Sequence, residues 1–314
     1  MTDVAILGGG AWGSALAVLA KRAGRTPVLW ARDPARAKLT DPGILVTGDL
    51  AGVLAPVVLL AVPAAAVRAV AADWRRAGGR GIRVVCAKGF DPGTGRLLSD
   101  VLEADAPDDP VAVLSGPTFA AEAARGVPTA ATVASADGQV AARVAAALGS
   151  PTFRLYTSAD VVGVEAAGAF KNVLAIACGI ADGMGTGDNA RAALITRGLA
   201  ELARLVAALG GRPETVMGLA GLGDVVLTCT SGQSRNYSFG RRLGEGASRE
   251  AALAASPGVV EGAATAASLL ARGRALGLDL PVTEAVDAVL NRGADLAATA
   301  AGLLARPTGV PETG

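Results

Sequence analysis

The sequence predicts an α/β protein with an N-terminal doubly wound, mostly parallel sheet and a C-terminal all-α domain. The 314 residues are enough for about two domains. Up to residue 163, short β-branched runs alternate with alanine-rich helical periods, which is the βαβ pattern of parallel sheets. After that point only helical periods follow. We therefore expect domains at residues 1–163 and 164–314.

The predicted elements follow from this change of pattern. We expect strands at residues 4–7, 27–31, 57–62, 82–87, 111–114, 130–134 and 153–157. Between them we expect helices at residues 14–23, 64–77, 95–104 and 139–148. The second domain is predicted to contain helices at residues 164–181, 189–209, 213–217, 238–244, 263–276, 282–290 and 295–304.

Composition argues against several classes of function. The net charge is +1 and no block of like charge occurs, so we expect neither a nucleic-acid partner nor a membrane-surface partner. The longest uncharged run, residues 50–67, contains Pro56 and Pro63. A buried strand followed by a helix explains that run better than a membrane span. We expect no membrane insertion.

Residues commonly used in acid–base or metal chemistry are scarce. The chain has no histidine, which excludes Ser-His-Asp hydrolysis and histidine-ligated metals. A general acid must then be Lys, Asp, Glu, Tyr or Cys. Cys86, Cys178 and Cys229 are too far apart to form a disulfide framework or a metal-ligand pair. With no cleavable leader visible, these features predict a cytoplasmic protein without a metal site.

The first strand runs into a glycine-rich loop that has the context of a dinucleotide-binding motif. Gly8, Gly10 and Gly13 match G-x-G-x-x-G between a strand and a helix, and a second strand follows. We expect Gly8 to permit the turn, Gly10 to admit the pyrophosphate and Gly13 to let the helix pack on the strand. The helix N-terminus favours phosphate. The N-terminal domain is therefore predicted to be of the Rossmann type.

Residues at the end of the second strand select between the two nicotinamide cofactors. An acidic residue there would bind the ribose hydroxyls of NAD. The strand instead ends at Trp30 and Ala31, followed by Arg32 and Asp33. Arg32 is placed to bind a 2′-phosphate, so the sequence favours NADP(H). Asp33 keeps NAD(H) open as the alternative.

Two further strand ends carry polar groups. Lys88 follows the fourth predicted strand, and the loop at residues 115–118 follows the fifth. Ligands of doubly wound sheets bind at the carboxyl ends of the strands. We therefore expect Lys88 and this loop to face the same crevice as the glycine loop.

A single lysine lies within an apolar helix at the start of the second domain. Lys171 has only small and apolar residues three and four positions away on either side. A glycine-rich break at residues 183–187 follows, and Asp188 is placed to cap the next helix. The stretch by itself is compatible with one wall of an active site and with a helix–turn–helix that carries a surface lysine.

A second glycine-rich turn, residues 218–224, precedes another polar group. Thr228 lies four residues after Asp224, on the same face if the segment is helical. Ser234, Arg235 and Asn236 then lie on a turn before a helix. A guanidinium, an amide, a hydroxyl and helix N–H groups together form a phosphate site. A polar surface turn is the alternative.

Taken together, the motifs resemble the bacterial NAD(P)-dependent glycerol-3-phosphate dehydrogenases. The resemblance extends from GGGAWGSALA at residues 8–17 to VEG at residues 260–262. Its most specific parts are SGPTFA (115–120), GAFKNVLAIACGIADGMGTGDNARAALITRGLAE (168–201) and GLAGLGDVVLTCTSGQSRN (218–236). The resemblance implies reversible reduction of dihydroxyacetone phosphate to sn-glycerol 3-phosphate, which supplies phospholipid synthesis.

The resemblance also implies roles for individual residues. Lys171 would be the proton donor and acceptor, with Asp224 positioning it and Lys88 beside the substrate. Thr228 and Asn189 would help to orient the lysine–aspartate pair. The implied substrate contacts are Lys88, Gly116, Thr118, Lys171, Asp224, Thr228, Ser234, Arg235 and Asn236. With the motif glycines Gly8, Gly10 and Gly13, the implied cofactor contacts are Ala11, Trp12, Arg32, Lys88, Ala120, Arg235, Val259 and Glu261.

Physical chemistry supports a lysine in this role. Hydride transfer to the carbonyl carbon requires a proton for the oxygen, and no histidine is present. A lysine with its ordinary pKa of about 10.4 is a poor proton exchanger at neutral pH. Burial and the Lys88 cation would lower the pKa of Lys171, whereas Asp224 and the substrate phosphate would raise it. From the sequence, the balance between these effects stays open.

Two departures and two alternatives accompany the resemblance. Ala11 stands where the family has a serine, and the segment between Arg36 and Val57 is short, so no strand is assigned there.

A related lysine-dependent hydroxy-acid reductase should lack the phosphate-binding pair Arg235 and Asn236. A non-catalytic nucleotide-sensing protein would not need Lys171. An alanine- and leucine-rich helical domain is compatible with a homodimer.

Overall fold

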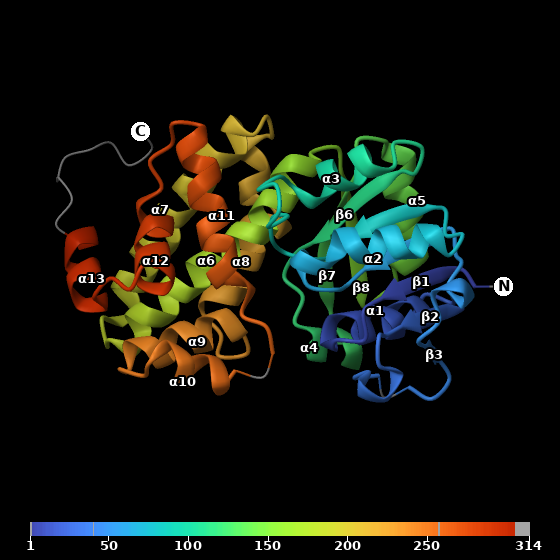
Figure 1. Ribbon diagram of the computed structural model, residues 1–314, viewed down its shortest axis with the longest axis horizontal. Coiled ribbons are helices and arrows are strands. Elements are labelled where there is room, and N and C mark those ends of the chain that lie inside the picture. Colours follow the sequence, from blue (N-terminus) through green and yellow to red (C-terminus); the bar gives the residue numbers. More distant parts are fainter. Residues whose placement is uncertain (1, 40, 257, 305–314) are drawn as a thin grey trace. The chain divides into compact units, whose positions relative to one another are not determined.

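A computed structural model describes residues 2–39, 41–256 and 258–304, except for the side chain of Leu304. Contacts divide the chain into two compact units, residues 1–165 and 166–314. The N-terminal unit contains a sheet with helices, and the C-terminal unit is helical in its described part (Figure 1). The predicted combination of a doubly wound sheet with an all-α domain is confirmed.

The described strands of the N-terminal unit form one sheet with the order β3-β2-β1-β4-β5-β6-β7-β8. Their bounds are β1 Val4–Leu7, β2 Pro27–Trp30, β3 Leu45–Thr47, β4 Val57–Leu60, β5 Ile82–Val85, β6 Val111–Ser115, β7 Thr129–Ala134 and β8 Phe153–Ser158. All neighbours pair in parallel except β6 and β7. Because β1, β4, β5 and β6 run in the same direction, their carboxyl ends share one edge of the sheet.

Helices cover both faces of this sheet, as the apolar character of its strands requires. They are α1 Ala11–Arg22, α2 Ala64–Arg76, α3 Leu98–Asp105, α4 Ala120–Arg125 and α5 Gly138–Leu148. Helix α1 packs against α4 and α5, and α2 packs against α3. Leu16 of α1 and Val144 of α5 join Ile6 and Leu59 of the sheet in one buried cluster. All four residues of β1 are buried.

Several short elements were not predicted. β3 lies at the edge of the sheet beside β2, within the shortened segment to which we assigned no strand. It has three residues, and Leu45 is 65% exposed, so it carries no alternating apolar pattern. Helix α4 follows the loop at residues 115–118 and has only six residues. Elements this short depend on tertiary packing, because an isolated helical turn is unstable.

The C-terminal unit is built from helices in its described part. Their bounds are α6 Val161–Gly183, α7 Gly187–Ala208, α8 Asp224–Cys229, α9 Arg235–Gly244, α10 Arg249–Ala254, α11 Glu261–Ala275, α12 Pro281–Asn291 and α13 Leu296–Leu304. A 3₁₀ turn, Pro213–Met217, and a π-helical turn, Leu219–Gly223, precede α8. Helices α8 and α10 were not predicted. The boundary between the two units lies inside α6.

Two predicted helix starts were wrong. Helix α9 begins at Arg235 rather than at residue 238, because the Ser234 hydroxyl accepts a hydrogen bond from the Tyr237 N–H at 3.2 Å and caps the helix. Asp188 does not cap α7. Thr186 is at the N-cap position, and Asp188 lies in the first turn and pairs with Arg191.

Helix α6 is the core helix of the C-terminal unit. Among the described helices it alone is long and apolar enough to cross a membrane, but 83% of its most apolar window is buried inside the protein. Phe170 and Leu174 have no exposed surface. This burial explains the apolar composition of α6. The run at residues 50–67 forms a short turn, β4 and the start of α2, so the predicted strand and helix are confirmed.

Two buried glutamates complete the N-termini of distant helices. Glu165 accepts a hydrogen bond from the Leu98 N–H at 2.7 Å, at the start of α3. Glu201 accepts from the Val282 N–H at 2.6 Å, near the start of α12. Burial raises the pKa of each carboxyl group to about 7. Because the first N–H groups of a helix lack partners within it, these side chains anchor α3 and α12.

Candidate active site

Lys171 is the centre of a buried polar cluster in the C-terminal unit. The lysine is 8% exposed, and Asp224 is fully buried. Lys171 Nζ donates to Asp224 Oδ1 at 2.7 Å and to Thr228 Oγ1 at 2.9 Å. The Thr228 hydroxyl in turn donates to Asp224 Oδ1 at 3.1 Å. The three groups form a closed triangle, so the surface-lysine alternative is excluded.

Local backbone geometry brings Asp224 to this position. A π-helical turn, Leu219–Gly223, runs directly into α8, whose first residue is Asp224. A Cβ atom at Gly221 would overlap the carbonyl oxygen of Val216, so only glycine fits there. Thr228 lies one helical turn after Asp224, on the same face. π-Helical turns of this kind occur often at functional sites.

The predicted phosphate-binding residues lie at the start of α9. Ser234 is the N-cap, Arg235 is exposed in the first turn, and Asn236 is 8% exposed. A Cβ atom at Gly258 would lie 2.8 Å from the Arg235 guanidinium nitrogen Nη1, so glycine leaves room for that side chain. A positive side chain and a helix N-terminus both attract anions.

Asn172 was missed from the sequence. Asn236 Nδ2 donates to Asn172 Oδ1 at 2.9 Å, and the Gly262 N–H donates to Asn236 Oδ1 at 3.1 Å. The two amides therefore join α6, α9 and α11. One signal was available, because Asn172 is a second polar residue beside Lys171 in an otherwise apolar stretch.

The predicted role of Asn189 was wrong. This residue is exposed in the first turn of α7 and makes no hydrogen bond with Lys171 or Asp224. Helix α6 continues for 12 residues beyond Lys171, to Gly183, which corresponds to about 18 Å of helix. That length separates the start of α7 from the buried triangle.

The glycine loop of the N-terminal unit has the geometry expected of a dinucleotide site. Gly8 has φ of +132°, and a Cβ atom there would lie 2.5 Å from the Ala61 carbonyl oxygen. A Cβ at Gly13 would overlap Gly8. Gly10 has an ordinary φ of −73°, and a Cβ there would meet no described atom within 4 Å. Packing explains Gly8 and Gly13, whereas the open space at Gly10 suits a ligand.

Other features of this loop fit a pyrophosphate group. No side chain caps the N-terminus of α1, so its first N–H groups are available to an anion. The indole Nε1 of Trp12 is buried without a partner among the described residues. Ala11 is exposed at the first position of α1. These residues fit a dinucleotide cofactor.

The polar residues that follow two other predicted strands lie close together in the N-terminal unit. Lys88 Nζ donates to the Gly116 carbonyl at 3.1 Å, and the Thr118 hydroxyl donates to the same oxygen at 3.2 Å. Gly116 has φ of +151°, and a Cβ there would lie 2.8 Å from Ala131 Cα. Ala120 is the first residue of α4. Lys88 and Thr118 thus share the edge at which β5 and β6 end.

Arg32 and Asp33 differ in the hydrogen bonds and ion pairs that they make within the chain. Arg32 is exposed and makes no hydrogen bond or ion pair with the described residues. Asp33 caps a 3₁₀ turn, where its carboxylate accepts from the Ala35 N–H at 3.1 Å, and it lies 3.8 Å from the Arg36 guanidinium. The carboxylate that would bind the NAD ribose is therefore already hydrogen-bonded.

Nearby thiols and phenols are poor acids at neutral pH. Burial raises the pKa of the Cys229 thiol well above its usual value, although the Lys171 charge opposes this effect. Burial and a hydrogen bond with Asp182 raise the pKa of Tyr237. Cys86, Cys178 and Cys229 are all buried, and none of them forms a disulfide bond. Among the acids left open by the missing histidines, Lys171 has the best-formed polar setting.

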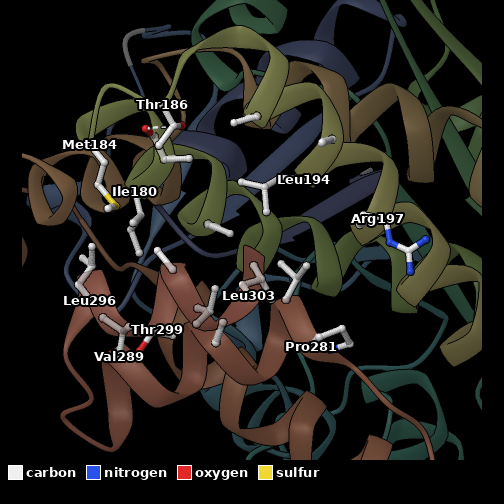
Figure 2. A pocket seen from close by; sticks show the side chains of 18 residues that line it. Ile180, Met184, Thr186, Leu194, Arg197, Pro281, Val289, Leu296, Thr299 and Leu303 are labelled. Carbon is white, nitrogen blue, oxygen red and sulfur yellow. Dashed lines mark hydrogen bonds between the residues drawn. The ribbon is translucent and has the colours of Figure 1, made fainter. Parts of the chain in front are cut away.

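One cavity in the C-terminal unit shares no lining residue with this cluster. It has a volume of about 370 Å³ and is lined by α6, α7, α12 and α13 (Figure 2). Ile180, Leu194, Val289 and Leu303 point into it, and Arg197 lies at one end. None of the predicted site residues lines it. Its lining is almost wholly apolar, so it offers no set of groups for hydride or proton transfer.

Both parts of the chain match models of one enzyme family. The N-terminal and C-terminal models of NAD-dependent glycerol-3-phosphate dehydrogenase match residues 3–43 and 38–141, and residues 160–301. The chain is 48% identical to the NAD(P)+ glycerol-3-phosphate dehydrogenase of Rhodospirillum rubrum, over 97% of this chain and 92% of that protein. It is 49% identical to the enzyme of the same name from Methylobacterium radiotolerans, over 98% and 97% of the two chains.

A solved structure shows the same relationship. The crystal structure of glycerol-3-phosphate dehydrogenase from Coxiella burnetii matches with a TM-score of 0.91 and 37% identity, covering 97% of this chain and 99% of that one. The resemblance inferred from the motifs is confirmed. The chain therefore belongs to the family of NAD-dependent glycerol-3-phosphate dehydrogenases.

Proposed function

We propose that this enzyme reversibly reduces dihydroxyacetone phosphate to sn-glycerol 3-phosphate, for glycerophospholipid synthesis, and that Lys171 exchanges the proton at the carbonyl oxygen. Bound NAD(P)H supplies the hydride. The observation that carries the proposal is the triangle of Lys171, Asp224 and Thr228, which is buried inside the helical unit. A general acid of this kind contributes about 10²- to 10⁴-fold to a rate.

Each member of the triangle has a distinct task. Asp224 and Thr228 hold the Lys171 ammonium in one orientation, because both accept a hydrogen bond from it. The ammonium donates its proton to the ketone oxygen in the reductive direction and stabilises the negative charge that develops there. In the oxidative direction the neutral amine accepts the hydroxyl proton.

The start of α9 is proposed to bind the substrate phosphate. Arg235 presents a guanidinium fork that matches two phosphate oxygens, and the first N–H groups of the helix add donors. Ser234 and Asn236 complete this group, and Asn236 is held in place by Asn172. Lys88, Gly116 and Thr118 are proposed to contact the substrate from the N-terminal unit.

The two units have complementary tasks in this proposal. Residues 1–163 bind the dinucleotide, and residues 164–314 bind the substrate and carry the acid. The cofactor contacts implied by the family resemblance are, in the N-terminal unit, Gly8, Gly10, Ala11, Trp12, Gly13, Arg32, Lys88 and Ala120, and in the C-terminal unit Arg235, Val259 and Glu261. Val259 is 54% exposed, and Glu261 begins α11. Both are close in sequence to Gly258, which borders Arg235.

We also propose that the enzyme works in the cytoplasm, without nucleic acid or membrane insertion, and that it forms a homodimer. Its three buried thiols fit a reducing compartment. A hydroxy-acid reductase is disfavoured, because it has no use for a phosphate site. A nucleotide-sensing protein is disfavoured by the buried Lys171–Asp224 pair.

Substrate discrimination tests the proposed reaction. With NADPH, dihydroxyacetone phosphate should drive oxidation of the cofactor at a kcat/KM at least about 1,000-fold above that for dihydroxyacetone, because the phosphate contacts contribute several kcal/mol of binding. The measurement is the initial rate of NADPH absorbance loss over a range of each ketone. Equal activity on the two ketones would overturn the phosphate site, and activity on neither would overturn the proposed reaction.

Replacement of Arg32 tests cofactor choice. Arg32→Ala should weaken NADPH binding about 10- to 100-fold and NADH binding less than about 3-fold, because a charge-assisted contact with the 2′-phosphate contributes about 1.5–3 kcal/mol. Dissociation constants from cofactor fluorescence give the comparison. Arg36→Ala is the matched control, since Arg36 is also highly exposed and lies four residues further on. Equal losses for the two cofactors would refute this role of Arg32.

A further inference from the structure

Helices α6 and α9 of the C-terminal unit touch through their backbones. Gly179 and Gly183 lie one turn apart on α6. A Cβ atom at Gly179 would overlap the carbonyl oxygen of Tyr237, and one at Gly183 would overlap that of Arg241. These obstacles are backbone atoms of α9, which cannot rotate away as a side chain can. Any larger residue at either position must push the two helices apart.

The contact is reciprocal. Gly240 and Gly244 lie one turn apart on α9, and a Cβ atom at either would overlap the carbonyl oxygen of Ile176 or Ile180 on α6. We call these two glycine pairs, one on each helix, the glycine contact. Glycine is a poor helix former, so four glycines at this spacing within two helices indicate a demand for close approach.

The glycine contact also defines a register between the helices. Gly240 follows Ile176 by 64 residues, the same separation as that between the hydrogen-bonded amides Asn172 and Asn236. A constant separation means that α6 and α9 run parallel and advance together, turn by turn. The hydrogen bond between the side-chain amides of Asn172 and Asn236 therefore belongs to the same interface, one turn closer to the start of α9.

That register relates the proton donor to the phosphate-binding residue. Lys171 and Arg235 immediately precede the two amides on their helices, so they are at matching levels of α6 and α9. In dihydroxyacetone phosphate a single methylene separates the ketone carbon from the phosphate ester. A substrate held at both ends requires a fixed spacing between these two side chains.

We propose that the glycine contact is a positioning device that sets the spacing between Lys171 and Arg235, and that it thereby makes the enzyme specific for a ketone next to a phosphate ester. The proposal rests on the proposed function of the two side chains. The glycines touch no substrate. They act by allowing α9 to lie directly on α6.

Gly240→Ala tests this role. The added methyl group should separate the helices, so that phosphate and ketone are no longer held at once. We expect kcat/KM for dihydroxyacetone phosphate to fall about 100-fold. The much lower kcat/KM for dihydroxyacetone, measured at high enzyme concentration, should fall less than about 3-fold, because this ketone makes no phosphate contact. If Gly240→Ala does not fold, Gly244→Ala, one turn further along α9, replaces it. It should also lower kcat/KM for dihydroxyacetone phosphate more than kcat/KM for dihydroxyacetone.

Gly198→Ala is the matched control. A Cβ atom at Gly198 of α7 would lie 2.5 Å from Leu174 Cδ1. The added methyl group would also contact α6, but it would meet the Leu174 side chain, which can change rotamer. Any loss of activity should then be equal for the two ketones, as it would be for a variant that is merely less stable.

The outcomes separate the two proposals. A selective loss of the phosphorylated ketone in Gly240→Ala or Gly244→Ala supports the positioning role. Equal losses for the two ketones, or no loss, overturn it. If the unaltered enzyme does not oxidise NADPH with dihydroxyacetone phosphate, the proposed function itself fails.

Discussion

Lys171→Met is expected to lower kcat for dihydroxyacetone phosphate at least about 1,000-fold, while NADPH binds with nearly unchanged affinity. The variant removes the proton donor, which contributes about 10²- to 10⁴-fold, and the cation that faces the developing alkoxide, which contributes about 10²- to 10³-fold. Single-turnover rates measured with saturating NADPH isolate this loss from changes in binding. Retention of more than about a tenth of the turnover would remove Lys171 as the acid.

The same variant leaves the fully buried Asp224 without its lysine. Removing one partner of a buried ion pair costs about 3–5 kcal/mol of stability. The double variant Lys171→Met with Asp224→Asn should recover most of that stability but none of the turnover. This result would separate a catalytic loss from a folding loss, with thermal unfolding as the measure of stability.

Lys21→Met is the control for removing a lysine. Lys21 pairs with Asp41 at 2.7 Å, the distance found for Lys171 and Asp224, but its side chain is 42% exposed rather than 11%. Exposed pairs contribute about 0–1 kcal/mol. Lys21→Met should therefore change neither the stability nor kcat to a measurable extent.

With saturating NADPH, Arg235→Ala is expected to lower kcat/KM for dihydroxyacetone phosphate by at least about 100-fold and to lower activity on dihydroxyacetone far less. Truncating one partner of a hydrogen-bonded charge pair costs about 2–5 kcal/mol. Arg235→Lys keeps the charge but loses the planar fork, so it should recover only part of the activity. Initial-rate kinetics with both ketones give the result.

Arg241→Ala is the control on the same helix. Arg241 is 57% exposed and pairs with Glu245 at 2.8 Å, six residues beyond Arg235. Its removal should affect neither ketone by more than about 2-fold. Similar losses in the Arg235 and Arg241 variants would mean that the charge of α9, rather than a particular contact, attracts the phosphate.

Much of the fold was predictable because it depends on local patterns. Buried parallel strands such as Val57–Leu60 are short continuous apolar runs, and the alternation with helices is visible without tertiary information. The end of that alternation near residue 164 is likewise visible in the sequence, whereas contacts divide the chain inside α6, between residues 165 and 166. Short elements were missed, because β3 and α8 have three and six residues and depend on neighbours that are distant in the chain.

The site was predictable only in part. Turn and helix-start chemistry pointed to Gly10 and Arg235 from a few adjacent residues. From the residues alone, Lys171 stayed between a surface lysine and a buried one. Its pairing with Asp224, 53 residues later, came from the family resemblance and not from any periodicity.

The sequence by itself determined the glycine loop between a strand and a helix, the combination of a sheet with a helical part, and the family, since each depends on contiguous motifs of turn glycines, capping residues and apolar periods. Only the tertiary structure decided that Lys171 is buried, that Asn172 holds Asn236 and that Asn189 lies elsewhere. It also decided the register of α6 against α9. Those facts depend on which faces of the helices contact each other. Side chains distant in the sequence select these faces through close packing, so a single stretch of sequence does not reveal them.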